Sequence, residues 1–214
     1  MTDRHLTPTD RLLMTLDNGL RTVFAKPPVS ERPDPAENIP DTELSPGERQ
    51  LAGRLMRINH AGEVSAQGLY QGQALTARLP GVRAALERSA LEENDHLAWC
   101  QRRTQELGTH VSYLNPLWYL GSLAIGATAG VAGDRWSLGF VAETERQVIR
   151  HLEGHLARLP LQDSKSRAIL EQMKEDEARH GNLAAEAGGR PLPLPLRGMM
   201  GLLSKVMTTA AYWV

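Results

Sequence analysis

The chain has 214 residues, 41% hydrophobic and 23% charged, which is enough for one sizeable core, and we therefore expect one main domain. Its formal net charge at pH 7 is −1, which argues against the basic surface that nucleic-acid binding requires. The single cysteine, Cys100, excludes an intramolecular disulfide and fits a reducing compartment.

The N-terminal region is expected to hold one helix followed by a proline-rich arm. The stretch PTDRLLMTLDNGLRTVFA, residues 8–25, has apolar residues close to a helical period, with Thr9 available as a cap. Residues 26–46 contain six prolines, which favours a linker or an extended arm and not a packed element. We expect no secretory signal, because the first residues have no apolar run. Residues 1–44 are thus predicted to be a helix and arm, and residues 45–214 the main domain.

The main domain is predicted to be all-α. Ser45, followed by Pro46 and then by Glu48, is typical of a capping box at the start of a helix. This helix should end at about Arg78, before the Pro80 turn. Further helices are expected over residues 82–107, over residues 135–160, from the Asp163–Ser164 cap to the AGGRP stretch, and over residues 195–214. No segment has a convincing period of two, so we expect no sheet.

Between these helices lies an uncharged segment, Val111 to Gly133. Its 23 residues are enough to cross a bilayer. Pro116 and four glycines, with a low content of large aliphatic residues, argue against a spanning helix. We expect a helix that is buried in a bundle or lies partly in a membrane interface.

A repeat in the main domain carries candidate metal ligands. Glu63 is followed by a Glu-x-x-His motif, and a lone Glu145 is followed by a second one. In both halves a glycine lies nine residues after the lone glutamate. The point midway between Glu63 and the first motif falls near residue 79, at a predicted turn, and the corresponding point of the second half falls near residue 162, also at a turn. Antiparallel helices would therefore bring six side chains to one level: Glu63, Glu93, His96, Glu145, Glu177 and His180.

This set of side chains matches a metal site inside a helical bundle. Glutamate and histidine three residues apart share one helix face. Two lone glutamates and two Glu-x-x-His motifs can enclose two irons or manganeses, and four carboxylates balance four positive charges. One such motif alone is an ordinary solvated helix face, whereas two with matching partners favour a metal centre. Glu143 is an alternative to Glu145 on spacing alone, although the glycine match favours Glu145.

Three further residues are candidates for supporting the ligands. His60 lies one turn before Glu63, and could either bond a carboxylate or be a helix-surface histidine. Asp95 and Asp176 each lie beside a ligand in the sequence and could orient an imidazole.

The motifs LMRINHAGEVSAQGLYQGQ, EENDHLAWC, VAETERQVIRHL and EDEARHGNLA together resemble the demethoxyubiquinone hydroxylase family of ubiquinone biosynthesis, in its bacterial form. The resemblance covers about residue 51 to the C-terminus. It implies a ferritin-like four-helix bundle with additional apolar helices and two iron ions per chain, held by the six side chains above. In such enzymes the glutamate of each Glu-x-x-His, here Glu93 and Glu177, tends to bridge the irons, and Glu63 and Glu145 would be terminal ligands.

The resemblance also implies an activity and its partners. The enzyme would be a monooxygenase that uses O2 to hydroxylate the ring of a polyprenyl benzoquinol. Its electrons would come from an external donor, NADH or the quinol itself. The substrate implies a peripheral position on the cytoplasmic face of the cell membrane, reached through residues 111–133 and the apolar C-terminal helix. A homo-oligomer or a biosynthetic complex is compatible with this role, and nucleic acid is not an expected partner.

Two other functions are compatible with parts of the pattern. Another ferritin-like di-iron protein, such as an iron store, a peroxidase or a tRNA hydroxylase, would share the ligands. The neutral charge and the lone Cys100 do not favour these. A non-catalytic quinone-binding scaffold would not need all six ligands.

Overall fold

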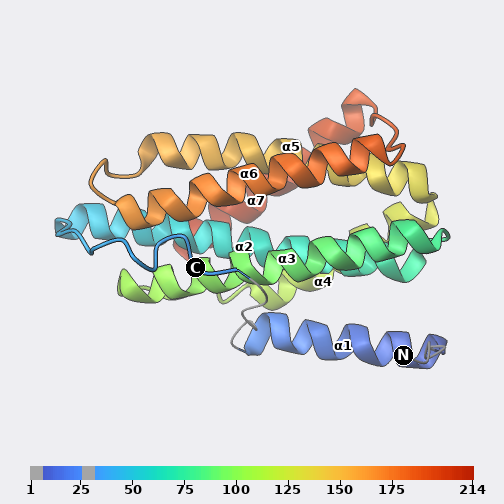
Figure 1. Ribbon diagram of the computed structural model, residues 1–214, viewed down its shortest axis with the longest axis horizontal. Helices are drawn as coiled ribbons and strands as arrows, with labels where there is room; N and C mark the ends of the chain where they lie inside the picture. Colours follow the sequence, from blue (N-terminus) through green and yellow to red (C-terminus); the bar gives the residue numbers. More distant parts are fainter. Residues whose placement is uncertain (1–6, 26–31) are drawn as a thin grey trace.

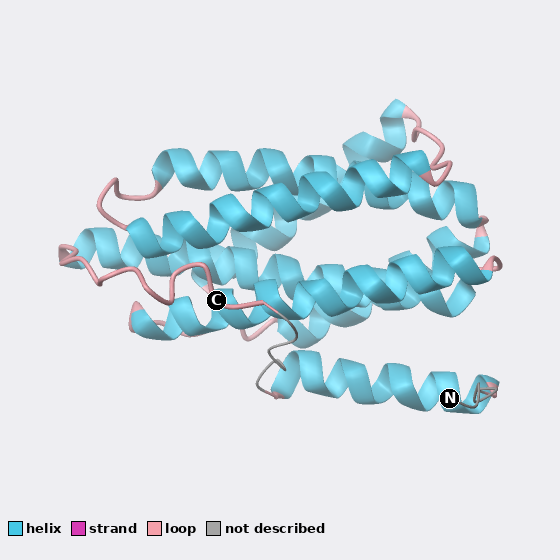
Figure 2. Ribbon diagram, viewed as in Figure 1, coloured by secondary structure: helices cyan, strands magenta, loops and turns pink. Residues whose placement is uncertain are grey.

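The computed structural model describes residues 7–25 and 32–214, and every regular element in these ranges is a helix. The all-α class is therefore confirmed for the described residues (Figure 2). The helices are α1 (Pro8–Phe24), α2 (Pro46–Thr76), α3 (Pro80–Glu106), α4 (Asn115–Val131), α5 (Asp134–Arg158), α6 (Ser164–Glu186) and α7 (Leu194–Trp213).

Two helical hairpins form the bundle. The hairpin of α2 and α3 lies against the hairpin of α5 and α6, with α3 contacting α6 and α2 contacting α5 (Figure 1). Helix α4 connects the hairpins and packs on α2, while α7 also packs on α2 and α5. Helix α1 lies outside the bundle, beside α2 and α4. The arrangement is a four-helix bundle with additional helices, as predicted.

Local sequence explains where the helices begin. Ser45 and Glu48 form the predicted capping box of α2, each bonding to the backbone of the other. Asp163 caps α6 by accepting a hydrogen bond from the backbone of Ser166. For α1 the predicted cap is wrong: Thr7, and not Thr9, forms a capping box with Asp10. A capping box needs an acidic residue or a glutamine three positions after the cap, and Asp10 lies three positions after Thr7 and not after Thr9.

Glycines allow α4 to approach α2 closely. A Cβ atom on Gly126 of α4 would overlap the carbonyl oxygen of Leu69, and one on Gly72 of α2 would overlap that of Leu123. By contrast, Gly154 of α5 has open space around it. The two glycines of the sequence repeat therefore have different environments, and only Gly72 is required by packing.

The proline-rich arm is packed, which corrects the sequence-based expectation for residues 32–44. Ala36 and Leu44 belong to the main hydrophobic core cluster and are 6% and 7% exposed. Asp34 caps the turn by accepting from the backbone of Ala36, and it pairs with Arg102 of α3 at 3.0 Å. The arm therefore lies on the bundle and is held by both apolar and charged contacts.

Two apolar clusters occupy the ends of the bundle and leave a polar level between them. One contains Leu55, Trp99, Leu170 and their neighbours, and the other contains Tyr70, Leu138 and their neighbours. The predicted ligands fall between these clusters along all four bundle helices. Because apolar packing on both sides excludes water and lowers the local dielectric constant, charges buried between the clusters interact strongly.

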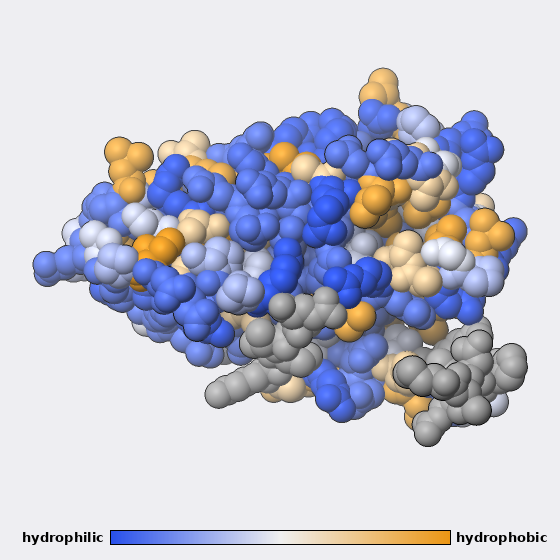
Figure 3. Space-filling model, viewed as in Figure 1, coloured by the Kyte–Doolittle hydropathy of each residue, from blue (hydrophilic) through white to orange (hydrophobic). Residues whose placement is uncertain are grey.

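The outer helices expose apolar side chains. On α4 these include Leu117, Leu120 and Val131, and on α7 they include Leu203 and Trp213. On the face shown in Figure 3, hydrophobic residues are most frequent at the end of the bundle beside the start of α1. No helix in the described ranges has both the length and the hydropathy to cross a membrane.

Candidate metal centre

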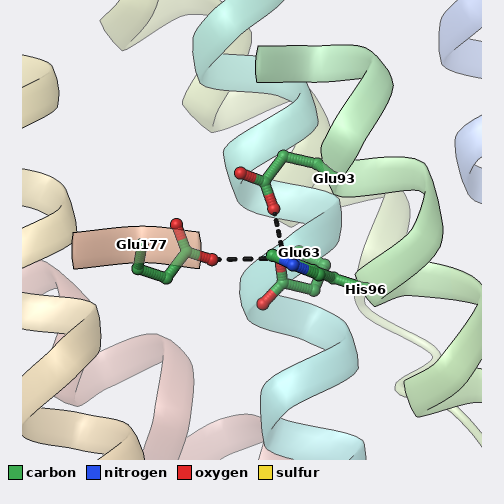
Figure 4. Close-up of side chains that lie close together, drawn as sticks. All are labelled: Glu63, Glu93, His96 and Glu177. Atoms are coloured by element: carbon green, nitrogen blue, oxygen red, sulfur yellow. Dashed lines mark hydrogen bonds and ion pairs between the residues drawn. The ribbon is translucent and has the colours of Figure 1, made fainter. Parts of the chain in front are cut away.

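The bundle brings all six predicted ligands to one buried level. Each of these side chains belongs to a residue that is at most 4% exposed. Ligand atoms of Glu63, Glu93, His96 and Glu177 lie within 4.8 Å of one another (Figure 4). They come from three helices, α2, α3 and α6. The turn-based alignment of the helices therefore places distant residues together as expected.

The first half of the cluster surrounds His96. Its Nδ1 atom lies 2.8 Å from Glu93 Oε2, 3.2 Å from Glu177 Oε1 and 3.7 Å from Glu63 Oε2. The three carboxylates thus face a single imidazole nitrogen. One cation placed among them would have four donors from this chain.

The second half surrounds His180. Its Nδ1 atom lies 3.1 Å from Glu93 Oε1 and 3.4 Å from Glu177 Oε2. Glu93 and Glu177 therefore direct one oxygen at His96 and the other at His180. A carboxylate placed in this way can join two metal ions.

Glu145 lies on the same side as His180. Its carboxylate accepts a hydrogen bond from the hydroxyl of Tyr70 on α2. Gly181 lets α5 and α6 approach here, since a Cβ atom on it would lie 3.3 Å from Glu145 Cβ. Glu143 instead pairs with Arg146 and Gln147. The structure thus directs Glu145, and not Glu143, toward the cluster.

Several buried polar atoms of the cluster lack hydrogen bonds within the described part of the chain. They are Glu93 Oε1, Glu177 Oε2 and His180 Nδ1. A buried polar atom without a hydrogen bond is costly, and such atoms rarely gather in one place. Their convergence fits bound cations, because carboxylate oxygen and imidazole nitrogen are the donors that iron and manganese accept.

Electrostatics also favours positive charge at this level. Burial raises the pKa of Glu63 and Glu145 well above the usual value, and the charges of Glu93 and Glu177 raise both further. Burial opposes the charging of His180, but the close carboxylates of Glu177 and Glu93 raise its pKa to about 11. Protons therefore balance the carboxylates when no metal is bound, and metal binding would release them.

Each imidazole has an acidic partner on its outer nitrogen. His96 Nε2 lies 2.9 Å from Asp176 Oδ2, and His180 Nε2 lies 2.8 Å from Glu92 Oε2. Arg179 Nη2 donates to both acids, at 2.8 Å to Glu92 and 3.1 Å to Asp176. Such contacts fix which ring nitrogen faces a metal.

Sequence reasoning missed Glu92. It directly precedes Glu93 as Asp176 precedes Glu177, and each acid serves the histidine of the other motif. This equivalent position in the repeat was the signal available in the sequence.

The other two supporting candidates lie further out. Asp95 is 1% exposed and accepts a hydrogen bond from Arg32 Nε at 3.3 Å. His60 is 3% exposed, and its Nδ1 lies 3.4 Å from Asn115 Nδ2. Among the described residues, the hydrogen-bond partner of His60 is thus an amide and not a carboxylate.

A pocket of about 440 Å³ lies beside the cluster, between α1, α2 and α3. Most of the surface of its wall is apolar, with Met14, Leu75 and Leu91 among the lining residues, and Arg21, Arg83 and Glu87 also line it. Tyr70 also lines it and separates it from Glu145. An apolar ligand in this pocket would be one side chain away from the buried carboxylates.

Comparison with known proteins gives a consistent result. The family model described as "Ubiquinone biosynthesis protein COQ7" matches residues 50–211. A 3-demethoxyubiquinol 3-hydroxylase of Nitrosococcus oceani is 61% identical over 214 residues, covering 100% of both chains. Proteins of the same name from Nitrosomonas eutropha and Stutzerimonas stutzeri are each 57% identical, covering 96% and 98% of this chain and 98% and 97% of their own.

Proposed function

The chain belongs to the COQ7 family of ubiquinone biosynthesis proteins, and from this we propose that it is a monooxygenase that hydroxylates the ring of demethoxyubiquinol with O2. The relatives that match along nearly their whole length are named as hydroxylases of this quinol. One structural observation carries the proposal for this chain. Glu93 and Glu177 each face both imidazoles inside a buried, ferritin-like bundle.

We assign two iron ions per chain to this cluster. Glu63 and His96 would hold one, Glu145 and His180 the other, and Glu93 and Glu177 would join them. Iron bound there supplies the electrons and open coordination positions that O2 activation requires. The donor set supports this assignment, since four carboxylates and two neutral imidazoles balance two divalent ions.

The protein's own contribution is to orient these groups and to exclude water. Asp176 and Glu92 accept from the outer nitrogens of the imidazoles, so that each Nδ1 lone pair faces the cluster. Tyr70 holds one oxygen of Glu145 through its hydroxyl. The apolar clusters above and below keep bulk water from the reacting groups.

The pocket between α1, α2 and α3 is our candidate for the quinol. Its apolar wall suits a ring with a prenyl chain, and it ends at Tyr70 beside the cluster. Electrons would come from an external donor, NADH or the quinol itself. A homo-oligomer or a biosynthetic complex fits the exposed apolar residues as well.

We further propose that the protein works at the cytoplasmic face of the cell membrane, as a peripheral protein. The apolar side chains on α4 and α7 support contact with the bilayer surface in which the substrate is dissolved.

Quinone profiling tests the proposed function. A strain that lacks the protein should accumulate the demethoxy quinone, and the wild-type gene should restore ubiquinone. Glu177→Ala should not restore it and should lower the iron content, whereas Glu175→Ala, an exposed neighbour on α6, should behave as wild type. An unchanged quinone profile in the deletion strain would refute the proposal.

A further inference from the structure

An arginine from the proline-rich arm reaches the outer side of the metal centre. Arg32 Nη1 donates to Asp176 Oδ2 at 2.7 Å, and its Nε donates to Asp95 Oδ2 at 3.3 Å. Asp95 belongs to α3 and Asp176 to α6. One guanidinium therefore joins the two hairpins of the bundle at the level of the cluster.

The same oxygen of Asp176 serves both Arg32 and His96. Asp176 Oδ2 lies 2.7 Å from Arg32 Nη1 and 2.9 Å from His96 Nε2. Its other oxygen, Oδ1, accepts from Arg179 at 3.1 Å and from Gln172 at 3.4 Å. The two oxygens thus have separate partners, and Arg32 bonds the oxygen that faces the imidazole.

Trp99 completes the arrangement. The Arg32 guanidinium carbon lies 5.2 Å from the centre of the Trp99 ring, a distance at which cation and ring attract. The centre of the same ring lies 5.4 Å from that of His96. The guanidinium is therefore held by two carboxylates and one aromatic face, and the imidazole contacts two of those three groups.

We propose that Arg32 is a positioning residue of the metal centre, which holds Asp176 so that His96 keeps its Nδ1 lone pair directed at Glu63, Glu93 and Glu177. The inference rests on the metal centre proposed above. Arg32 lies outside residues 50–211, the part that the family model matches. The arm therefore adds to the centre a contact that the matched region does not contain.

Residues other than Arg32 also attach the arm to the bundle. Asp34 pairs with Arg102 on α3, and Ala36 and Leu44 are buried in the core. Arg102→Ala is thus a matched control, since it removes one arm contact and leaves the guanidinium bridge in place.

Cobalt binding measures the proposed role without relying on activity. Purified metal-free protein is titrated with Co²⁺ against a competing chelator, and bound Co²⁺ is followed by its visible absorption. Arg32→Ala should weaken one of two binding steps by up to about 10-fold, the lower end of the effect of removing a residue that bonds a metal ligand directly, because Arg32 acts through Asp176. Only one step should change, because His180 is oriented by Glu92 and not by Asp176. Arg32→Lys should recover part of the loss, and Arg102→Ala should bind as wild type.

A double-mutant cycle tests whether Arg32 acts through Asp176. In the Asp176→Asn background, Arg32→Ala should cause little further loss. Circular dichroism and thermal unfolding of the metal-free variants check folding, and Arg32→Gln replaces Arg32→Ala if the latter unfolds. Wild-type affinity in Arg32→Ala or Arg32→Gln, an equal loss in Arg102→Ala, or a full additional loss in the Asp176→Asn background would overturn the inference. If wild-type protein binds neither Co²⁺ nor iron, the metal centre itself fails, which is a different result.

Discussion

Tyr70 on α2 donates its hydroxyl hydrogen to Glu145 on α5, across the interior of the bundle. The ring of Tyr70 also forms part of the pocket wall beside α1. Burial and the nearby charges of Glu145 and Glu93 raise the pKa of the Tyr70 hydroxyl well above its usual value, so it remains a donor. This one side chain connects the proposed substrate pocket to the proposed metal ligands.

Replacing Tyr70 by phenylalanine should therefore impair the reaction. Tyr70→Phe leaves one oxygen of a buried carboxylate without its donor, a loss of about 1.5–3 kcal/mol, or roughly 10–100-fold in rate if it acts on the reacting state. Product formation by iron-loaded protein is the measurement. Tyr119→Phe is the control, because its hydroxyl donates to Gln71 at 2.6 Å and not to a proposed ligand. Equal rates for Tyr70→Phe and wild type would contradict the role.

Glu92 should matter for one metal ion only. Although burial opposes it, hydrogen bonds from His180 and Arg179 lower the pKa of Glu92 to about 2, so the group is ionised at neutral pH. Glu92→Gln should weaken metal binding at the His180 side by about 10–100-fold. Iron content after dialysis against a chelator measures this, with the exposed Glu171→Gln as control. If the Glu92→Gln variant retained both ions, this would argue against a role for Glu92 in orienting His180.

The close contact of α2 and α4 predicts a difference between two glycines of the same helix. Gly126→Ala should lower the free energy of unfolding by about 1–3 kcal/mol, because its Cβ atom would overlap the carbonyl of Leu69. Gly121→Ala should raise it by up to about 1 kcal/mol, because the site is open and alanine favours a helix. Urea unfolding provides both values, and similar values would refute the packing argument.

His60 should make stability depend on pH. Burial lowers its pKa to about 4, so the folded protein holds it neutral while the unfolded chain binds a proton near its ordinary value of about 6.5. The stability that the protein gains from keeping His60 neutral is therefore complete above the unfolded-state pKa of about 6.5. It is lost as the pH falls toward the folded-state pKa of about 4. The loss between pH 7 and pH 5 should be roughly 2 kcal/mol.

Urea unfolding at the two pH values isolates this contribution. His60→Asn does not titrate and retains an acceptor for Asn115, so its stability should fall less than that of wild type. An identical fall in both proteins would show that other groups cause the pH dependence.

Membrane contact through α7 is also testable. Leu203→Glu places a charge among the exposed apolar residues of α7 and should reduce binding to vesicles of anionic lipid several-fold. Leu161→Glu, in the turn between α5 and α6, adds the same charge at a leucine that is more exposed, 86% against 49% for Leu203, and serves as the control. Co-sedimentation with the vesicles measures both, and unchanged binding of Leu203→Glu would place the contact elsewhere.

The helices and the ligand level could be predicted from the sequence because both depend on local spacing. Antiparallel helices align residues at equal distances from a turn, which is how Glu63 and the ENDH motif were matched. The choice between Glu143 and Glu145 depends on the rotation of α5 about its axis. The spacing argument leaves that rotation open, and the contacts of Glu143 with Arg146 and Gln147 show it.

Contacts between distant segments could not be predicted in the same way. Arg32 precedes Asp176 by 144 positions, and a proline-rich stretch does not indicate what it packs against. Glu92 and Asp95 both lie beside ligands in the sequence, but only the position of α6 shows that His180 meets Glu92. The equal spacing of Gly72 and Gly154 favoured Glu145, the residue that the structure directs toward the cluster, but it did not show that only Gly72 packs closely against another helix.

The two hairpins contribute equal shares to the buried cluster. Each supplies one lone glutamate, one Glu-x-x-His motif and one acid that orients the histidine of the opposite hairpin. Helix α4 joins them without providing any of these groups. A single helical hairpin paired with a copy of itself would therefore present the same inventory. Duplication and fusion of a gene for one such hairpin would therefore be enough to produce a centre of this kind.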